Sequence, residues 1–184
     1  MHCFDKSGPD NTGKALEIAF ETARNRGIVN MVVASTWGNT AREAVEHLQG
    51  GGVNLVVVTH NTGFKSPGAQ EFDPEIRRMV EDAGGKVLTA TMPTRTLGRA
   101  IKNKMGFSQE DIACAAWRML CEGVKVCVEI AGMACDSGLV PPGPVVAVAG
   151  TGKGADTVMI IDALPSNDTF NMKIREILAK PINF

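Results

Sequence analysis

Short apolar runs alternate with amphipathic stretches along the chain. Runs rich in Val, Ile and Ala predict strands at residues 29–34, 53–59, 86–90, 145–149 and 157–163, with a further short strand at 2–5. Apolar residues three and four apart predict helices at 12–26, 74–83, 95–104, 108–119 and 123–137, and another from about residue 40 to the glycines at 50–52. Strands that are apolar throughout are typical of a parallel sheet covered on both faces. The pattern predicts a single α/β domain over residues 1–184.

The turn after the first buried strand has features of a phosphate site. The apolar run ends in Ser35 and Thr36, passes through Gly38 and enters a helix at Asn39 and Thr40. A helix start has unpaired N–H groups and carries the positive end of the helix dipole, so it favours an anion. The hydroxyls add donors, and a glycine lets the backbone approach the anion closely. The alternative is that Asn39 or Thr40 only caps the helix and Gly38 only makes the turn.

A long loop follows the second buried strand. It runs from His60 to Phe72 and has no pattern of a helix or strand. Loops of this length are uncommon in compact domains and are often functional. This loop leaves the carboxyl end of a strand, the edge at which open α/β sheets bind ligands. We therefore expect it to lie over the same crevice as the turn at Ser35.

A second glycine-rich turn comes later in the chain. Gly150, Gly152 and Ala155 match the G-x-G-x-x-A form of the dinucleotide-binding fingerprint. That fingerprint requires a helix next, because the helix N-terminus holds the pyrophosphate, whereas the residues that follow here have the pattern of a strand. A Walker P-loop fails as well, since Gly154 follows Lys153 where Ser or Thr is needed. We predict a hairpin connection.

Two helical stretches carry charges that allow a structural or a functional interpretation. A basic stretch begins at Arg95, and either Arg95 or Arg99 can face a ligand, although such charge is usually a solvated face. The stretch at 123–137 is apolar on nearly every side, which predicts a buried helix. Lys125 and Glu129 lie four residues apart in it, and the spacing favours a structural ion pair over a ligand site. Asp73 and Pro74 are predicted as the N-cap and the first residue of a helix, and Ser108 with Asp111 predicts a capping box at the start of another.

Composition narrows the classes of function. The chain has 184 residues, of which 44% are hydrophobic and 21% charged, and a formal net charge of −1. These values are typical of an ordinary globular domain, so nucleic acid is not an expected partner. No apolar run reaches the roughly 18 residues of a membrane span, and the N-terminus has no secretory pattern. We expect a cytoplasmic protein without a membrane contact.

Cysteine and histidine spacing gives no indication of a metal site. The five cysteines form no C-x-x-C pair, and all but Cys3 lie in apolar helical stretches. Buried free thiols explain them better than a disulfide framework. The three histidines also lack zinc-type spacing. No Ser/His/Asp or Cys/His pattern has a local signature, and residues 34–36 do not match a nucleophile elbow, so catalytic residues stay unassigned.

Several motifs resemble a known family. The turn at 35–41, the block at 145–150, the segment at 154–157 and the strand after it resemble the C-terminal α/β domain of pyruvate kinase. A closer similarity is to free-standing archaeal and bacterial proteins, largely uncharacterised, that look like this domain alone. Their pattern is recognisable along nearly the whole chain, at residues 11–12, 32–35, 62–64, 125–130, 154–157 and 175–178.

The resemblance implies a three-layer αβα fold with a mostly parallel, five-stranded sheet whose last strand is antiparallel. It also implies a phosphorylated ligand at the carboxyl edge of the sheet, with FMN as the nucleotide associated with the family. The matching positions are Ser35, Thr36, Gly38, Asn39, Thr40, His60, Thr62, Gly63, Phe64, Thr151, Gly152, Lys153, Gly154 and Asp156. Residues 92–94 depart from the family pattern, which leaves the role of that edge open. The barrel that carries catalysis in pyruvate kinase is absent, so kinase activity is not implied.

Two classes of function are consistent with the resemblance. The protein is either a flavin-dependent enzyme of unknown substrate or a non-catalytic sensor or regulatory domain for a sugar phosphate or nucleotide. In an enzyme, the flavin carries the redox chemistry and the protein orients it, and Lys65, Lys153 and Arg95 are candidates for a cation near the ring. The apolar helix at 123–137 can equally serve a subunit interface, which leaves a homo-oligomer open.

Overall fold

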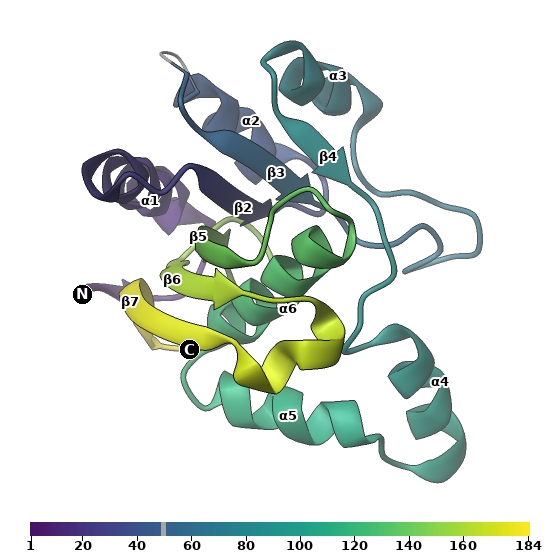
Figure 1. The fold of residues 1–184 in the computed structure, drawn as a ribbon. Coiled ribbons are helices and arrows are strands. Elements are labelled where there is room, and N and C mark those ends of the chain that lie inside the picture. Colours follow the sequence, from purple (N-terminus) through teal and green to yellow (C-terminus); the bar gives the residue numbers. More distant parts are fainter. Residues whose placement is uncertain (49–50) are drawn as a thin grey trace.

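Figure 1 shows the computed structural model of the chain, which describes residues 1–48 and 51–184. The helices are α1 (Thr12–Arg26), α2 (Asn39–Glu46), α3 (Pro74–Asp82), α4 (Thr96–Met105), α5 (Gln109–Arg118) and α6 (Glu122–Asp136), with short 3-10 helices at Pro9–Asn11 and Ser166–Asn171. The strands are β1 (His2–Lys6), β2 (Asn30–Ala34), β3 (Asn54–Val58), β4 (Lys86–Leu88), β5 (Gly143–Ala149), β6 (Thr157–Ala163) and β7 (Lys173–Asn183). Gly50, one of the glycines expected to end the second helix, lies outside the described residues.

The strands form one mixed sheet in the order β1-β7-β6-β5-β2-β3-β4. β2 lies between β5 and β3 and is parallel to both, so that Val33 is in register with Val148 and Val57. β6 is antiparallel to its two neighbours, β5 and β7. The predicted α/β class, the mostly parallel sheet and the hairpin after β5 are therefore confirmed.

The sheet has seven strands and not the five that the resemblance implies. One edge accounts for part of the difference: β1 pairs in parallel with β7, and His2 is in register with Ala179. The other addition is β7 itself, at Lys173–Asn183, where the sequence pattern predicts no strand. A hydrophobic pattern reports which face of a segment is buried, but it does not report pairing between segments so far apart in sequence.

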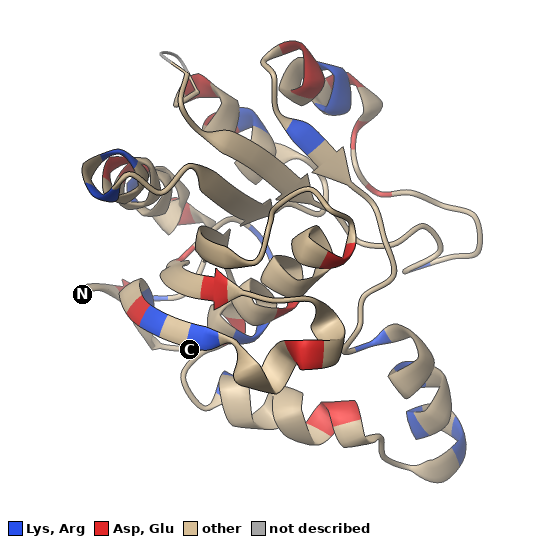
Figure 2. Ribbon diagram, viewed as in Figure 1, with Lys and Arg blue, Asp and Glu red and all other residues tan. Residues whose placement is uncertain are grey.

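Helices cover both faces of the sheet. Successive residues of a strand point to opposite sides. Met31 and Val33 belong to the core that the sheet forms with α1, α2 and α3, whereas Val32 belongs to the core that it forms with α6. Strands that are buried on both faces are expected to lack charged side chains, and Figure 2 shows no charged residue on β2, β3 or β5. The predicted αβα layers are present, and α6 is the buried helix.

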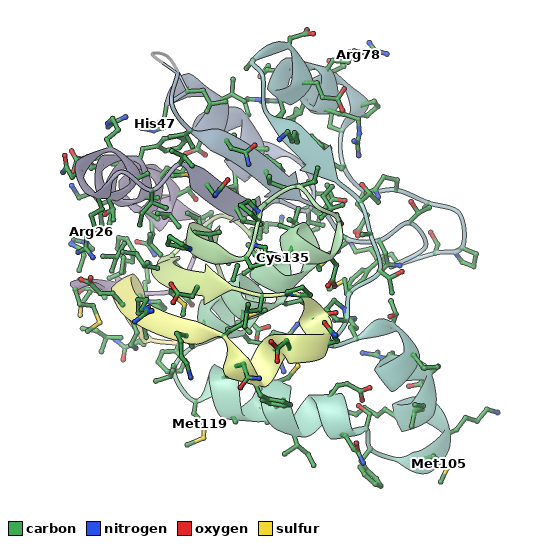
Figure 3. All side chains as sticks on the ribbon, in the orientation of Figure 1. Arg26, His47, Arg78, Met105, Met119 and Cys135 are labelled. Carbon is green, nitrogen blue, oxygen red and sulfur yellow. The ribbon has the colours of Figure 1, made fainter. Side chains whose placement is uncertain are left out.

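α5 packs against α6, and α4 packs against α5, at the outside of the layered body (Figure 1). Their outer surfaces carry exposed apolar side chains, including Met105 and Met119, which are labelled in Figure 3. The capping box predicted at the start of α5 is wrong, because the Ser108 side chain makes no capping hydrogen bond. Its Oγ is turned toward α4: a Cβ added to Gly98 would lie 3.2 Å from it. By contrast, the Asp73 side chain caps α3 as predicted, by accepting a hydrogen bond from the backbone N of Glu75 (2.7 Å).

Candidate functional site

Three turns meet at the carboxyl edge of the central strands. β5, β2 and β3 are parallel neighbours, so the segments that follow them emerge side by side. These segments begin at Ser35, Thr59 and Gly150, and with α6 they enclose a cleft of about 240 Å³. The carboxyl edge is where open α/β sheets bind ligands, and the cleft is the candidate site.

The turn from Ser35 to Thr40 presents backbone donors at one end of this cleft. The first hydrogen bond of α2 runs from Arg42 N to Gly38 O (2.8 Å). The N–H groups of residues 36–40 have no hydrogen-bond acceptor within the part of the chain that the structure describes. We call these groups the N–H row. They stand at the positive end of the α2 dipole, and such an arrangement suits an anion with several oxygens.

Two residues of the same turn serve the fold. Ser35 is buried, and its Oγ accepts a hydrogen bond from Ala41 N (3.3 Å), which is a helix-capping contact. Gly38 is the residue before α2 and has a φ of 110°. A Cβ added to Gly38 would lie 2.5 Å from Cδ1 of Ile76, on α3. Ser35 therefore has the capping role proposed for Asn39 or Thr40, and packing against α3 is a reason for the glycine besides close approach of an anion.

The loop after β3 is held across the cleft by polar side chains. His60 Nδ1 lies 2.9 Å from Glu71 Oε2, and Lys65 Nζ lies 3.1 Å from Glu71 Oε1. On its other side, His60 Nε2 lies 3.3 Å from Thr36 Oγ1, in the turn from Ser35 to Thr40. The loop thus shares the crevice of that turn, as predicted. Burial by itself would raise the pKa of Glu71, but hydrogen bonds from His60 and Lys65 and their charges outweigh it, and the pKa is lowered.

Aromatic and cationic groups stack on the same loop. The ring centroids of His60 and Phe64 are 3.8 Å apart. The guanidinium of Arg95 lies 4.1 Å from the centroid of the Phe64 ring, so Phe64 contacts both His60 and Arg95. Burial and then the charge of Arg99 lower the pKa of Arg95, although a guanidinium stays charged at neutral pH. Of the two arginines considered from the sequence, Arg95 lines the cleft.

The turn from Gly150 to Asp156 is anchored by a buried carboxylate. Asp156 is fully buried. Its Oδ2 accepts hydrogen bonds from the backbone N of Gly8 and of Thr151, both at 3.2 Å, and its Oδ1 accepts one from Thr157 Oγ1 at 2.8 Å. The carboxylate is occupied by these bonds, so Asp156 supports the turn from within the protein.

The same turn is fastened to the start of α1. Ala155 N donates to Thr12 Oγ1 (3.0 Å). A Cβ added to Gly154 would collide with Pro9 and Thr12, so only glycine allows this contact. Lys153 lines the cleft, and its Nζ lies 5.6 Å from the centroid of the Trp37 ring.

α6 forms the floor of the cleft and carries a buried ion pair. Lys125 Nζ lies 2.6 Å from Glu129 Oε2, and the two residues are 4% and 3% exposed. Glu129 Oε1 also accepts hydrogen bonds from the hydroxyl and the backbone N of Thr94. The predicted pair is confirmed, and both partners line the cleft together with Met92. The edge at 92–94, whose role the resemblance leaves open, is therefore part of the site.

Most of the residues that the resemblance assigns to the ligand come together here. Those that line the cleft are Ser35, Thr36, Asn39, Thr40, His60, Phe64, Gly152, Lys153 and Gly154. Those placed in the same turns but outside its lining are Gly38, Thr62, Gly63, Thr151 and Asp156. Sequence reasoning did not assign the charged lining residues Arg118, Glu122, Lys125 and Glu129 to the site. The available signal was the presence of charges at four-residue spacing in or before an apolar helix.

Other groups considered from the sequence are placed as follows. Cys114, Cys121, Cys127 and Cys135 are buried free thiols, and Cys3 is exposed. Within residues 1–48 and 51–184, no group of three or more His, Cys, Asp or Glu side chains is arranged to hold a metal ion. In that part of the chain, no helix is both long enough and apolar enough to cross a membrane.

No protein-family model matches the chain. Among solved structures, it is similar to three of pyruvate kinase from Cryptosporidium parvum, one of them in complex with ADP. Sequence identity is 16%, 15% and 16%, with TM-scores of 0.44, 0.42 and 0.40 over 83%, 83% and 81% of this chain. The chain spans only 22–23% of the length of those pyruvate kinases. At these identities and TM-scores the similarity gives no information on a ligand or an activity.

Proposed function

We propose that the protein binds the phosphate group of a phosphorylated small molecule on the N–H row. The observation that carries this proposal is the run of backbone donors, at residues 36–40, without an acceptor in the described chain. A phosphate has enough oxygens to accept from several of these donors at once. Lys153 and Arg95 line the same cleft and add positive charge. The hydroxyl of Thr40, which also lines the cleft, is a further donor.

FMN is the phosphorylated compound to test first. Trp37 and Phe64 line the cleft, and aromatic faces suit a flat, apolar ring. The cleft of about 240 Å³ is smaller than the pockets of about 300 to 1,000 Å³ that enclose drug-sized ligands. We therefore propose that the phosphate end of FMN is enclosed and that its ring lies at the rim. A flavin bound in this way supplies redox chemistry, and the protein binds and orients it.

The first measurement is an absorbance spectrum of freshly purified protein, followed by mass spectrometry of the small molecules released on denaturation. Flavin bands and a stoichiometric FMN mass would support both parts of the proposal. A colourless protein that releases a different phosphorylated compound would support the phosphate site and exclude FMN as the resident ligand.

A titration tests the N–H row itself. FMN, riboflavin and inorganic phosphate are added to ligand-free protein, and binding is followed by calorimetry. We expect FMN to bind more tightly than riboflavin and phosphate to compete with FMN, because only the phosphate reaches the N–H row. Thr40→Val removes one donor at nearly constant size and should weaken FMN binding about tenfold to a hundredfold. Thr22→Val, on α1 and away from the cleft lining, is the matched control. Equal affinities for FMN and riboflavin would overturn the proposal.

A further inference from the structure

A hydroxyl, an imidazole and a carboxylate are hydrogen-bonded in series beside the N–H row. Thr36 Oγ1 lies 3.3 Å from His60 Nε2, and His60 Nδ1 lies 2.9 Å from Glu71 Oε2. The three residues come from separate segments: Thr36 follows β2, His60 follows β3 and Glu71 precedes α3. We propose that they form a nucleophilic relay that hydrolyses phosphate monoesters, with Thr36 as the nucleophile, His60 as the general base and Glu71 as a positioning residue.

The direction of the hydrogen bonds supports these roles. An ionised carboxylate only accepts hydrogen bonds, so His60 Nδ1 carries the proton that faces Glu71. Nε2 of the neutral ring then presents its lone pair to the Thr36 hydroxyl. An imidazole in this tautomer takes the hydroxyl proton as the oxygen attacks. The separation of 3.3 Å between Thr36 and His60 is within the range of ligand-free sites, whose catalytic hydrogen bonds tighten when substrate binds.

The imidazole is also held in its plane by its neighbours. Phe64 stacks on the His60 ring with a centroid separation of 3.8 Å. Arg95 lies against Phe64, and Lys65 pairs with the second oxygen of Glu71. A base whose orientation is fixed by a stacked ring and by a hydrogen bond loses little freedom when the substrate binds.

The nucleophile stands next to the anion site. Thr36 is the first residue of the N–H row, and Lys153 lines the same cleft. A phosphoryl group bound to the later N–H groups would have its phosphorus near Thr36 Oγ1. The same donors and Lys153 would stabilise the negative charge that builds on the phosphoryl oxygens. This inference rests on the proposed function, because the N–H row must hold the phosphate, and it assigns the substrate class.

The reaction balances without a further reactant except water. In the first half, a bond forms between Thr36 Oγ1 and phosphorus while the bond from phosphorus to the alcohol oxygen breaks. The hydroxyl proton passes to His60 Nε2 and from there to the leaving oxygen. In the second half, water attacks phosphorus and gives one proton to His60, the bond to Thr36 breaks, and Thr36 regains a proton. One water is consumed, one alcohol and one inorganic phosphate are released, and nothing is oxidised or reduced.

Hydrolysis of p-nitrophenyl phosphate tests the relay directly. We expect the wild-type protein to release p-nitrophenol, Thr36→Ser to retain activity and Thr36→Val to lose it. His60→Gln removes the base and should lower the rate about a hundredfold or more. His47→Gln is the matched control, since His47 stacks on Phe20 beside α1, at the other end of α2 (Figure 3). No release above the uncatalysed rate in the wild type, or equal rates in wild type, Thr36→Val and His60→Gln, would overturn the proposal.

A fluorophosphonate probe identifies the nucleophile independently of turnover. Attack by Thr36 expels fluoride and leaves a stable phosphonate ester, which intact-mass measurement and peptide mapping locate. We expect one adduct per chain, on Thr36, and slower labelling of His60→Gln than of His47→Gln. An adduct on another residue, or none, would contradict the assignment of Thr36.

Glu71 is tested by a readout that a purely structural role would not move. Glu71→Gln keeps the size of the side chain but removes the carboxylate that accepts a hydrogen bond from His60 Nδ1, so the tautomer of His60 is no longer fixed and the probe should label Thr36 more slowly. Glu71→Asp keeps a carboxylate and should restore part of the wild-type labelling rate. Equal labelling rates in Glu71→Gln and wild type would exclude the positioning role.

The same protein separates failure of this inference from failure of the proposed function. FMN is itself a phosphate monoester, so a site that hydrolyses such esters releases riboflavin from it, and this release is followed by chromatography alongside the FMN titration. Intact FMN at one molecule per chain in the purified protein would therefore support the proposed function and overturn the relay. If the protein binds FMN and inorganic phosphate but hydrolyses neither FMN nor p-nitrophenyl phosphate, the relay is overturned and the proposed phosphate site is not. Absence of FMN and phosphate binding would overturn the proposed function.

Discussion

The two loops that flank the cleft are held by different kinds of contact. The turn at 150–156 is anchored inside the protein, by the fully buried Asp156 and by the bond from Ala155 to Thr12. The loop at 59–72 is anchored through titratable side chains that water reaches, among them His60, with a side chain 27% exposed. Lys65, which also contacts Glu71, has a side chain 62% exposed.

The turn at 150–156 is therefore a structural wall of the cleft, whereas the loop at 59–72 is a wall whose contacts respond to pH and salt. Buried hydrogen bonds are little affected by salt, and their loss leaves polar groups unpaired in a dry interior. Partly exposed ion pairs are screened, contribute less and change with pH. The groups suited to proton transfer are on the responsive wall, and the glycines and buried carboxylate of the opposite wall keep Lys153 in place.

The largest effect should come from the buried anchor. Asp156→Ala leaves the N–H groups of Gly8 and Thr151 and the hydroxyl of Thr157 without their acceptor. We expect the free energy of unfolding to fall by about 3 kcal/mol or more, measured by urea denaturation. Asp82→Ala, at an exposed position at the end of α3, is the control and should change it by less than about 0.5 kcal/mol. A loss below about 1 kcal/mol for Asp156→Ala would mean that the buried contacts of the turn at 150–156 are no stronger than the exposed contacts of the loop at 59–72.

An intermediate effect should follow acidification. The folded-state pKa of Glu71 is lowered, so its contribution to stability is complete above its unfolded pKa, ordinarily about 4.3, and is lost as the pH falls through the lower folded value. We expect the amides of residues 60–72 to exchange faster below about pH 4 than near pH 6, after correction for intrinsic rates. Glu71→Gln should remove this acid response. The same response in Glu71→Gln and wild type would assign it to another group.

The smallest effect should come from the exposed cation. Lys65→Met removes the ion pair to Glu71 Oε1 but leaves the hydrogen bond from His60 to Oε2. Exposed pairs contribute about 0 to 1 kcal/mol, so the free energy of unfolding should fall by less than about 1 kcal/mol in thermal or urea denaturation. A larger loss would show that Lys65, and not His60, holds Glu71 and the loop.

The helices and central strands were predictable from sequence because each contains its own signal. The apolar run ending at Ala34 and the glycine at Gly27, in the left-handed C-cap conformation after α1, both act locally. The turn from Ser35 to Thr40 was predictable for the same reason, since a strand end, hydroxyls and a helix start are adjacent in the chain. The edge pairing of β1 with β7 was missed, because it joins His2 to Ala179 across nearly the whole sequence.

By itself, the sequence determined the α/β class, the buried helix at α6 and the turn that presents the N–H row, since hydrophobic periodicity and helix starts depend on neighbouring residues. Only the tertiary structure decided that Thr36, His60 and Glu71 meet, and that Lys125 and Glu129 form the floor of the same cleft. The physical reason is the order of the sheet. Parallel pairing of β2 with β3 and β5 places their carboxyl ends at one edge, and no local pattern specifies which strands become neighbours.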